Sequence, residues 1–272
     1  MSSKELVIDH ATSNDVLFPK EFGRGLVERD LTKYPPGHYM FAPPAEIKLI
    51  PRSEWSARIK EMEETKSRLS DIRMTGDNGK MIPALDQGQY GYCWAHSTVG
   101  CIHMLRAMDG QPYVPLSAFA VAATIKNGAN EGGWGAQSLD FVISKGVPDQ
   151  KYWPQGSANL SHGTAECWAN AALHKVTEDW QDLTNAQYDR NLTFDQVMTL
   201  LLSRIPVVGD FNFWGHSVCL LDPVEVEPGS FGVRLLNSWS NSWSDRGMGV
   251  LRGNQAIPDG AVAPRATKVS PV

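Results

Sequence analysis

Apolar residues recur at helical spacing along the chain as far as Leu202. Trp55, Ile59 and Met62 stand three or four positions apart with charged residues between them, which is the pattern of one buried helix face. Similar runs that end at a glycine, and a capping-box pair at Thr193 and Gln196, predict further helices. The predicted helices cover residues 53–70, 93–109, 117–124, 136–145 and 166–173, and a segment that starts near residue 193.

The pattern changes after Pro206. Short runs rich in β-branched and aromatic residues alternate with Gly, Pro and Asp, as in strands joined by turns. The predicted strands cover residues 207–211, 217–221, 231–236 and 248–251. Helices that come first and strands that come later predict an α+β fold, in which a helical lobe faces a twisted antiparallel sheet.

The two ends of the chain lack this periodicity. Prolines punctuate residues 1–50 and favour extended backbone over helix. We expect residues 1–79 to form an N-terminal extension, a proline-rich strap plus one helix, that ends at the turn-forming cluster of residues 75–79. Residues 256–272 are rich in Pro and Ala, so we expect a C-terminal tail that is loose or bound to the surface.

Composition argues against several classes of function. The 272 residues include 25 Lys plus Arg and 30 Asp plus Glu, a net charge of -5, which gives no support to nucleic-acid binding. No apolar run is long enough to cross a membrane, and the N-terminus lacks the apolar segment of a secretory signal. No cysteine spacing is of the zinc type, and no pattern implies a metal or an organic cofactor. We read Cys93, Cys101, Cys167 and Cys219 as reduced thiols and expect a cytoplasmic protein; one packaged into a larger particle would look the same.

One cysteine stands where a nucleophile would be favoured. Cys93 follows a glycine-rich loop and begins a predicted helix, whose free N–H groups and dipole favour a thiolate. A cysteine beside an aromatic is more often a small buried hydrophobe. The flanking loop and the Cys-Trp-Ala-x-Ser run that ends at Ser97 nevertheless favour a nucleophile. Gln87, on the loop, has an amide that can donate to a developing oxyanion.

Two further candidates lie far downstream. His216 precedes a predicted strand, and Asn237 begins an Asn-Ser-Trp triplet that ends at Trp239. The order Gln, Cys, His, Asn-Ser-Trp resembles the papain family of cysteine peptidases. The resemblance covers about residues 80–255 and implies a two-lobed papain-like domain, with the active site between an N-terminal α lobe and a C-terminal antiparallel β lobe.

The resemblance implies a role for each candidate. Cys93 would be the nucleophile, and His216 would take the thiol proton and later protonate the leaving amine. Asn237 would orient the imidazole, and Gln87 would complete an oxyanion hole with the backbone N–H of Cys93. His96 is the rival histidine, but its place on the helix of the nucleophile favours contact with core or solvent.

The resemblance also extends to substrate binding. Gly132 and Gly133 resemble the family's glycine wall, where missing side chains let an extended peptide bond to the backbone, although a simple glycine turn is the other reading. Trp134 would line an apolar subsite, and Trp239 would cover the His–Asn hydrogen bond. Of the proline-rich strap, we favour packing across the domain surface; the other possibility is intramolecular contact with the cleft, as a propeptide would make.

Some positions depart from the family. Tyr90 and Asn130 stand where relatives commonly have cysteines joined as a disulfide. Tyr92 replaces a small residue beside the nucleophile and is expected to narrow the cleft. Only nine residues separate Pro206 from His216, so loops that usually build one side of the groove are missing.

The sequence therefore favours a cysteine peptidase that hydrolyses peptide bonds through a Cys93 acyl-thioester, with a protein or peptide as substrate. The alternative is a papain-like scaffold that has lost turnover and serves as a structural or binding protein. The missing loop, Tyr92 and the N-terminal segment motivate that alternative. A third possibility, another thiol chemistry such as peptidoglycan amide cleavage or transglutamination, ranks last because those families generally lack the Asn-Ser-Trp triplet.

Overall fold

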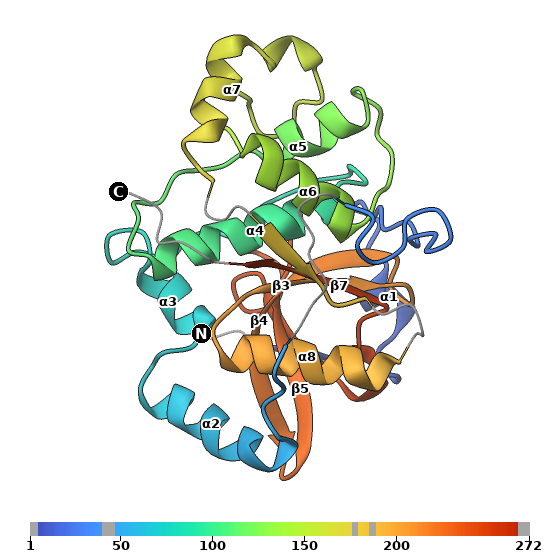
Figure 1. Cartoon of the computed structure of the whole chain (residues 1–272), viewed down its shortest axis with the longest axis vertical. Helices are drawn as coiled ribbons and strands as arrows, with labels where there is room; N and C mark the ends of the chain where they lie inside the picture. The colour runs from blue at the N-terminus through green and yellow to red at the C-terminus, as the bar shows by residue number, and fades with distance from the viewer. Residues whose placement is uncertain (1–4, 40–46, 176–178, 185–188, 266–272) are drawn as a thin grey trace.

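Helix α4 (Cys93–Met108) lies at the centre of the fold, between a group of helices and a sheet (Figure 1). The computed structural model describes residues 5–39, 47–175, 179–184 and 189–265. Every α4 residue from Cys93 to Arg106 is buried, because the helix packs against α5 and α6 on one side and against β4 on the other. Met108, at the end of the helix, is 37% exposed.

The other helices follow the predicted periodicity with shifted ends. They are α1 (Asn14–Leu17), α2 (Arg52–Glu64), α3 (Leu69–Thr75), α5 (Ala118–Ile125), α6 (Gly135–Lys145), α7 (Ala165–Ala172) and α8 (Arg190–Leu202), with short 3-10 turns at Leu160–His162 and Gly253–Ala256. The single helix expected over residues 53–70 is wrong, because Lys66 adopts a positive φ of 53° and separates α2 from α3. The expected start of α8 near Thr193 is also wrong, since the Asp189 side chain caps the helix by accepting the backbone N–H of Asn191 and of Leu192.

The strands form one mixed sheet in the order β1-β6-β5-β4-β3-β7-β2. They are β1 (Leu6–Ile8), β2 (Asp179–Asp182), β3 (Val207–Phe211), β4 (His216–Glu227), β5 (Ser230–Leu236), β6 (Met248–Arg252) and β7 (Gly260–Arg265). All neighbouring pairs are antiparallel except β1 and β6, which run parallel. The predicted strands after Pro206 are confirmed, and so is the α+β class with a helical lobe facing a sheet.

The C-terminal segment corrects one expectation. A loose or surface-bound tail from Gln255 onward is wrong for Gly260–Arg265, which form β7 between β3 and β2. Ala261, Val262 and Ala263 are buried there: Val262 packs on the α6 side of the sheet, and Ala261 and Ala263 pack on the α8 side. The rest of the expected tail, residues 266–272, lies outside the described residues.

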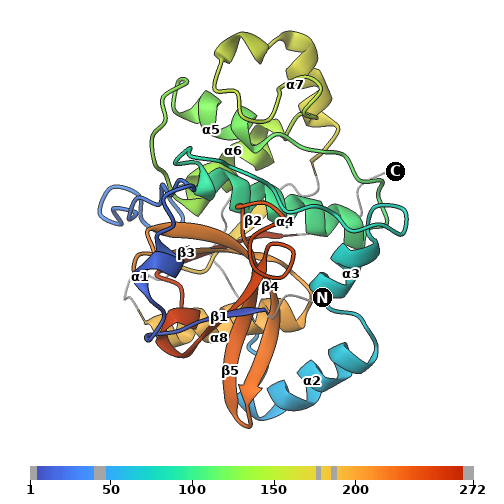
Figure 2. The same ribbon diagram turned by 180° about the vertical axis from the view of Figure 1, so that it is seen from behind.

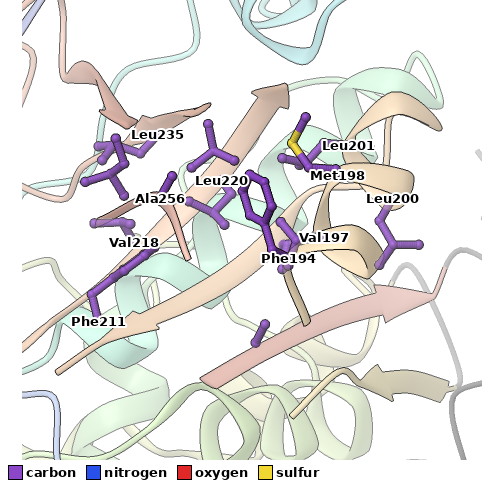
Figure 3. Close-up of a cluster of buried hydrophobic side chains, with 14 of the residues drawn as sticks. Phe194, Val197, Met198, Leu200, Leu201, Phe211, Val218, Leu220, Leu235 and Ala256 are labelled. Atoms are coloured by element: carbon purple, nitrogen blue, oxygen red, sulfur yellow. The ribbon is translucent and has the colours of Figure 1, made fainter. Parts of the chain in front are cut away.

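Buried apolar side chains pack on both faces of the sheet. Under the sheet, apolar residues of α8 pack against inward-facing strand residues, as Figure 3 shows for Phe194, Val197, Met198, Leu201, Phe211, Val218, Leu220 and Leu235. Burial of each large side chain contributes about 1.5–3 kcal/mol. Above the sheet, α4 packs its two faces into separate clusters, one with α5 and one with α3 and the strands. Helix α4 therefore belongs to both lobes, and its first residue lies where they meet.

The N-terminal segment runs along this meeting line. After β1 adds to the edge of the sheet, the chain passes through α1 and crosses the side of the molecule between the helical lobe and the sheet (Figure 2). The indole of Trp214 donates to the carbonyl of Leu17 at 2.7 Å and fixes the end of α1. Residues 22–31, which we call the covering strap, follow directly.

Candidate active site

The loop before α4 places Cys93 at the first turn of the helix. The Gly91 N–H donates to Asn130 Oδ1 at 2.7 Å, so a hydrogen bond ties this loop to the loop that carries Asn130. The Tyr92 hydroxyl donates to the carbonyl of Ala129 at 2.7 Å, and its ring packs against Phe119. Tyr92 therefore lies inside the helical lobe, and the expectation that it narrows the cleft is wrong.

The thiol of Cys93 is fully buried. Backbone N–H groups of Ser217, Gly25 and Trp94 point to it and favour the thiolate, but burial outweighs them and raises the pKa of Cys93 to about 12. The contact with Ser217, the neighbour of His216 in β4, brings the start of α4 beside the start of β4. A 2.9 Å hydrogen bond between the Ser97 and Ser217 hydroxyls joins the same two elements.

His216 and Asn237 form a hydrogen-bonded pair. Nε2 of His216 lies 2.8 Å from Oδ1 of Asn237, and rings of Trp214 and Trp239 pack on the imidazole with centroids 4.8 and 4.7 Å away. This enclosure lowers the pKa of His216 to about 3 through desolvation. Its other nitrogen, Nδ1, has no hydrogen-bond partner among the described residues. The ring is thus held by one nitrogen and can accept a proton at the other.

Both ring nitrogens of His96, the rival histidine, already have polar partners. Its Nδ1 lies 2.8 Å from the carbonyl of Tyr92, and its Nε2 lies 3.3 Å from the amide of Gln155. The ring stands edge-on to Phe119 inside the helical lobe, and burial lowers its pKa to about 4. His96 therefore stabilises the first turn of α4 and the loop that carries Gln155.

Gln87 already donates to a carbonyl. Its Oε1 accepts the Ser238 hydroxyl, and its Nε2 donates to the carbonyl of Gly23 at 2.9 Å. The Trp239 indole N–H points to the same Gly23 oxygen at 3.3 Å. The Gln87 amide, which the sequence predicts to donate to an oxyanion, thus donates to a carbonyl of the covering strap.

The strap can lie this close because it lacks side chains at two positions. A Cβ on Gly25 would come within 2.0 Å of the Gly91 oxygen, and one on Gly23 within 2.3 Å of the Tyr90 oxygen. Phe22 begins the strap with its ring stacked on Trp239, the centroids 5.2 Å apart. The sequence favours a strap that packs only across the domain surface. Residues 22–27 instead lie on the candidate catalytic residues.

The predicted glycine wall pairs with the same strap. Gly133 donates to the carbonyl of Gly25 and accepts from the Val27 N–H, both at 2.9 Å, so that Leu26 pairs with it in parallel. A Cβ on Gly132 would come within 2.5 Å of the Gly25 oxygen. Both glycines thus admit an extended chain. Trp134 follows them and donates from its indole to the Tyr39 hydroxyl at 3.0 Å.

Two acidic residues of the sheet beside this site were not predicted from the sequence. Asp210 lies within the apolar strand β3, and Asp182 ends β2, which was not predicted. Both are 8% exposed. A charged residue inside the run Val207–Phe211 is the one signal that pointed to Asp210, whereas nothing in the sequence paired it with Asp182.

The described part of the chain offers neither a metal centre nor a membrane-spanning helix. No group of three or more His, Cys, Asp or Glu side chains there could hold a metal ion. Within the same residues, no helix combines the length and apolar character needed to cross a membrane. All four cysteines are free, and the sulfurs of Cys101 and Cys219 lie 3.4 Å apart.

Comparison with known proteins adds to this geometry. A family model described as papain family cysteine protease matches residues 68–220, more than half of the chain. Zingipain-2 of Zingiber officinale is 23% identical over 198 residues, which cover 68% of this chain and 88% of that protein. A cysteine proteinase of Trypanosoma brucei brucei is 26% identical over 211 residues, 69% of this chain and 45% of its own.

Solved structures share the fold. Procathepsin L2 of the Tenebrio molitor larval midgut superposes with a TM-score of 0.61 at 17% identity, covering 96% of this chain and 84% of its own. Xylellain, a cysteine protease from Xylella fastidiosa, gives a TM-score of 0.57 at 16% identity, covering 91% of this chain and 97% of its own. The two-lobed arrangement is therefore common to these proteins and this chain.

Proposed function

The chain belongs to the papain family of cysteine proteases, and from that premise we propose that it hydrolyses peptide bonds through an acyl-thioester on Cys93. The observation that carries the proposal is the orientation of His216. Asn237 holds its Nε2, while Nδ1 has no partner among the described residues and the next backbone N–H in β4, that of Ser217, reaches the Cys93 thiol. In this proposal Cys93 is the nucleophile, His216 the proton carrier and Asn237 the orienting group, at the junction of α4 and β4.

In the proposed mechanism, His216 takes the thiol proton at Nδ1 and the sulfur attacks the carbonyl carbon of the scissile bond. The oxyanion accepts hydrogen bonds from Gln87 Nε2 and the Cys93 backbone N–H. The imidazolium then gives its proton to the leaving nitrogen as the C–N bond breaks, which leaves a thioester. His216 next deprotonates a water that attacks the thioester, and return of that proton to sulfur restores the thiol and releases the acid.

We further propose that the covering strap keeps the resting site closed. The carbonyl of Gly23 accepts a hydrogen bond from Gln87. The carbonyl of Gly25 accepts one from the Gly133 N–H, which an extended peptide would otherwise use. Burial under the strap also keeps both reacting groups neutral, since the pKa of Cys93 is about 12 and that of His216 about 3. Peptide entry therefore requires that the strap move, after which water returns to the site and the thiolate–imidazolium pair becomes favourable.

The test is peptide hydrolysis and Cys93 labelling by iodoacetamide in the full chain, read at each cysteine by mass spectrometry. We expect hydrolysis that Cys93→Ala abolishes and His216→Ala lowers by about 10³-fold or more. Cys167→Ala, at a buried thiol in α7 away from the site, is the matched control and should leave hydrolysis unchanged. Hydrolysis that survives Cys93→Ala would exclude the mechanism.

The second candidate is a papain-like scaffold without turnover. The covered site favours it, because every proposed substrate-binding backbone group of Gly133 is already paired with the strap. If peptide hydrolysis is absent both in the full chain and in Gly25→Ala, in which the strap cannot close without a clash, the scaffold is the better description.

A further inference from the structure

A cavity of about 130 Å³ lies beside the covering strap, next to the point where Leu26 pairs with Gly133. The strap residues Leu26–Arg29 form one wall of the cavity. Trp134 and Ala136, at the start of α6, form another, and sheet residues including Asp210 and Val262 form its floor. A peptide that replaces the strap at Gly133 would take the place of Leu26, beside Trp134 and the sheet residues that line the cavity.

The sheet register places two carboxylates on the face of the sheet that bears the cavity: Asp210 lines the cavity, and Asp182 is paired with Arg29, which also lines it. Asp210 lies opposite Gly260, and Asp182 lies opposite Val262 on the far side of the same strand, β7. Side chains opposite each other in antiparallel strands project from the same face, and so do those two residues apart along β7. Asp182 and Asp210 therefore face the same space, and Gly260, which has no side chain, leaves that space open.

One oxygen of Asp210 is available to a ligand. Its Oδ2 accepts the Gly135 N–H at 3.0 Å, whereas the buried Oδ1 has no hydrogen-bond partner in the described part of the chain. Burial raises the pKa of this carboxyl to about 6, only partly offset by the neighbouring Ser217 hydroxyl and the Gly135 N–H. A buried carboxylate with an unused oxygen is costly unless a donor or a cation reaches it.

The strap itself shows what the other carboxylate accepts. Nη1 of Arg29 lies 2.8 Å from Oδ2 of Asp182, with side chains only 8% and 3% exposed. Movement of the strap would remove this guanidinium from Asp182 and from the neighbourhood of Asp210. Two other acids line the cavity: Glu28 belongs to the strap, and Asp259 is 3.4 Å from Arg190 and is already paired.

We infer that Asp182 and Asp210 form an acidic subsite that selects an arginine or lysine side chain of the peptide substrate. The inference rests on the proposed peptidase function and names its substrate class. The ammonium or guanidinium takes the place of Arg29 and also reaches Oδ1 of Asp210. Trp134 and Val262 cover the methylene stem, which suits long basic side chains with an apolar stem and a charged end.

The experiment uses peptidyl fluoromethyl ketones that label Cys93 in the full chain. Arg, its neutral isostere citrulline, or Leu stands at one of three positions before the ketone, and labelling rates are read by intact mass. At one position we expect Arg to react at least about tenfold faster than citrulline, the difference that one charged hydrogen bond provides. Asp210→Asn and Asp182→Asn should each reduce this ratio to about threefold or less, and Asp259→Asn should leave it unchanged.

The opposite results overturn the inference. Citrulline or Leu reacting as fast as Arg at every position would do so, and so would an Arg preference that survives both Asp182→Asn and Asp210→Asn. In that case the cavity selects by shape alone.

A second readout needs no reactive thiol. In the full chain carrying Arg29→Ala, ethylguanidinium should raise the melting temperature more than its neutral analogue ethylurea does, and Asp182→Asn should remove the difference. Equal effects of the two compounds would also overturn the inference. If no ketone labels Cys93 in either the full chain or Gly25→Ala, the proposed peptidase function fails, and this rescue alone decides whether the floor binds a cation.

Discussion

The covering strap closes its two ends by different physical means. At the thiol end, Gly23 and Gly25 bring the backbone against the loop before α4, and the contacts are neutral hydrogen bonds. At the acidic end, the buried ion pair between Arg29 and Asp182 joins the strap to the sheet. Closure of the first end depends on missing side chains, whereas closure of the second depends on charge. The two ends should therefore respond to different changes.

The largest effect is expected at the thiol end. Gly25→Ala places a Cβ about 2.0 Å from the backbone oxygen of Gly91, which cannot move aside like a flexible side chain. The strap should leave the thiol, and labelling of Cys93 by iodoacetamide at neutral pH should rise at least about 100-fold as the thiol regains water. Glu21→Ala, at an exposed position just before the strap, is the control. Equal labelling rates in all three proteins would mean that the strap does not shield Cys93.

The pH dependence sharpens the same point. In the closed chain the pKa of Cys93 is about 12 and that of His216 about 3, so between these values both groups are neutral and only a trace of thiolate forms. Labelling should rise about tenfold per pH unit up to the highest pH at which the fold persists. In Gly25→Ala it should instead level off at a lower pH, and His216→Ala in that background should move the plateau up towards the pH of about 8.5 at which a free thiol ionises. A plateau near neutral pH in the unmodified chain would contradict the closed, neutral state.

A smaller effect is expected at the acidic end. Arg29→Leu removes the ion pair with Asp182 but keeps the glycine contacts around Cys93. Labelling of Cys93 should therefore rise, but by less than in Gly25→Ala, because the backbone contacts at the thiol end remain. Arg29→Lys, which keeps a cation near Asp182, should fall between Arg29→Leu and the unmodified chain. If Arg29→Leu matches Gly25→Ala, the two ends close as one unit.

The smallest effect concerns stability. Burial raises the pKa of Asp210 to about 6, from 3.8 when unfolded, so the folded state holds the proton more tightly. The carboxyl therefore lowers the free energy of unfolding progressively as pH rises from about 4 to 6, and by a constant amount above that. Asp210→Asn should raise stability at pH 7 by about 1–3 kcal/mol, with no gain at pH 4, as measured by urea unfolding at both values. An equal gain at the two pH values would assign the effect to packing instead.

Much of the thiol end could be predicted because its signals are local. The glycine loop, the helix that begins at Cys93 and the Asn-Ser-Trp triplet each depend on a few consecutive residues, and the structure brings Gln87, His216 and Asn237 together around them. The roles of these residues stay predictions until they are tested by substitution.

The acidic end and the strap could not be predicted, because their partners are distant in sequence. Gly25 looks like any loop glycine until the backbone of Gly91 is placed against it. Strand β2 is short and reads Asp-Trp-Gln-Asp, with none of the β-branched character that marks a strand. In β7, Pro264 suggested a loop, yet it lies opposite Trp180. Asp182 and Asp210 come to face the same space only because β7 lies between β2 and β3 in the folded sheet.

The two anchored ends of the N-terminal segment have a kinetic consequence. Strand β1 is bound to β6 before the strap, and α2 packs on α8 after it, so a strap that opens stays attached at both sides. It then competes with an incoming peptide as an intramolecular ligand, with an effective concentration on the order of millimolar for a short tether. A dilute peptide must therefore compete with the tethered strap, which does not diffuse away. The apparent Michaelis constant reflects that competition as well as the affinity for the peptide. A single cleavage within the strap would leave β1 bound and would weaken the competition of the strap with peptides. Inhibition would then decrease in part, whereas complete release of the strap would abolish it.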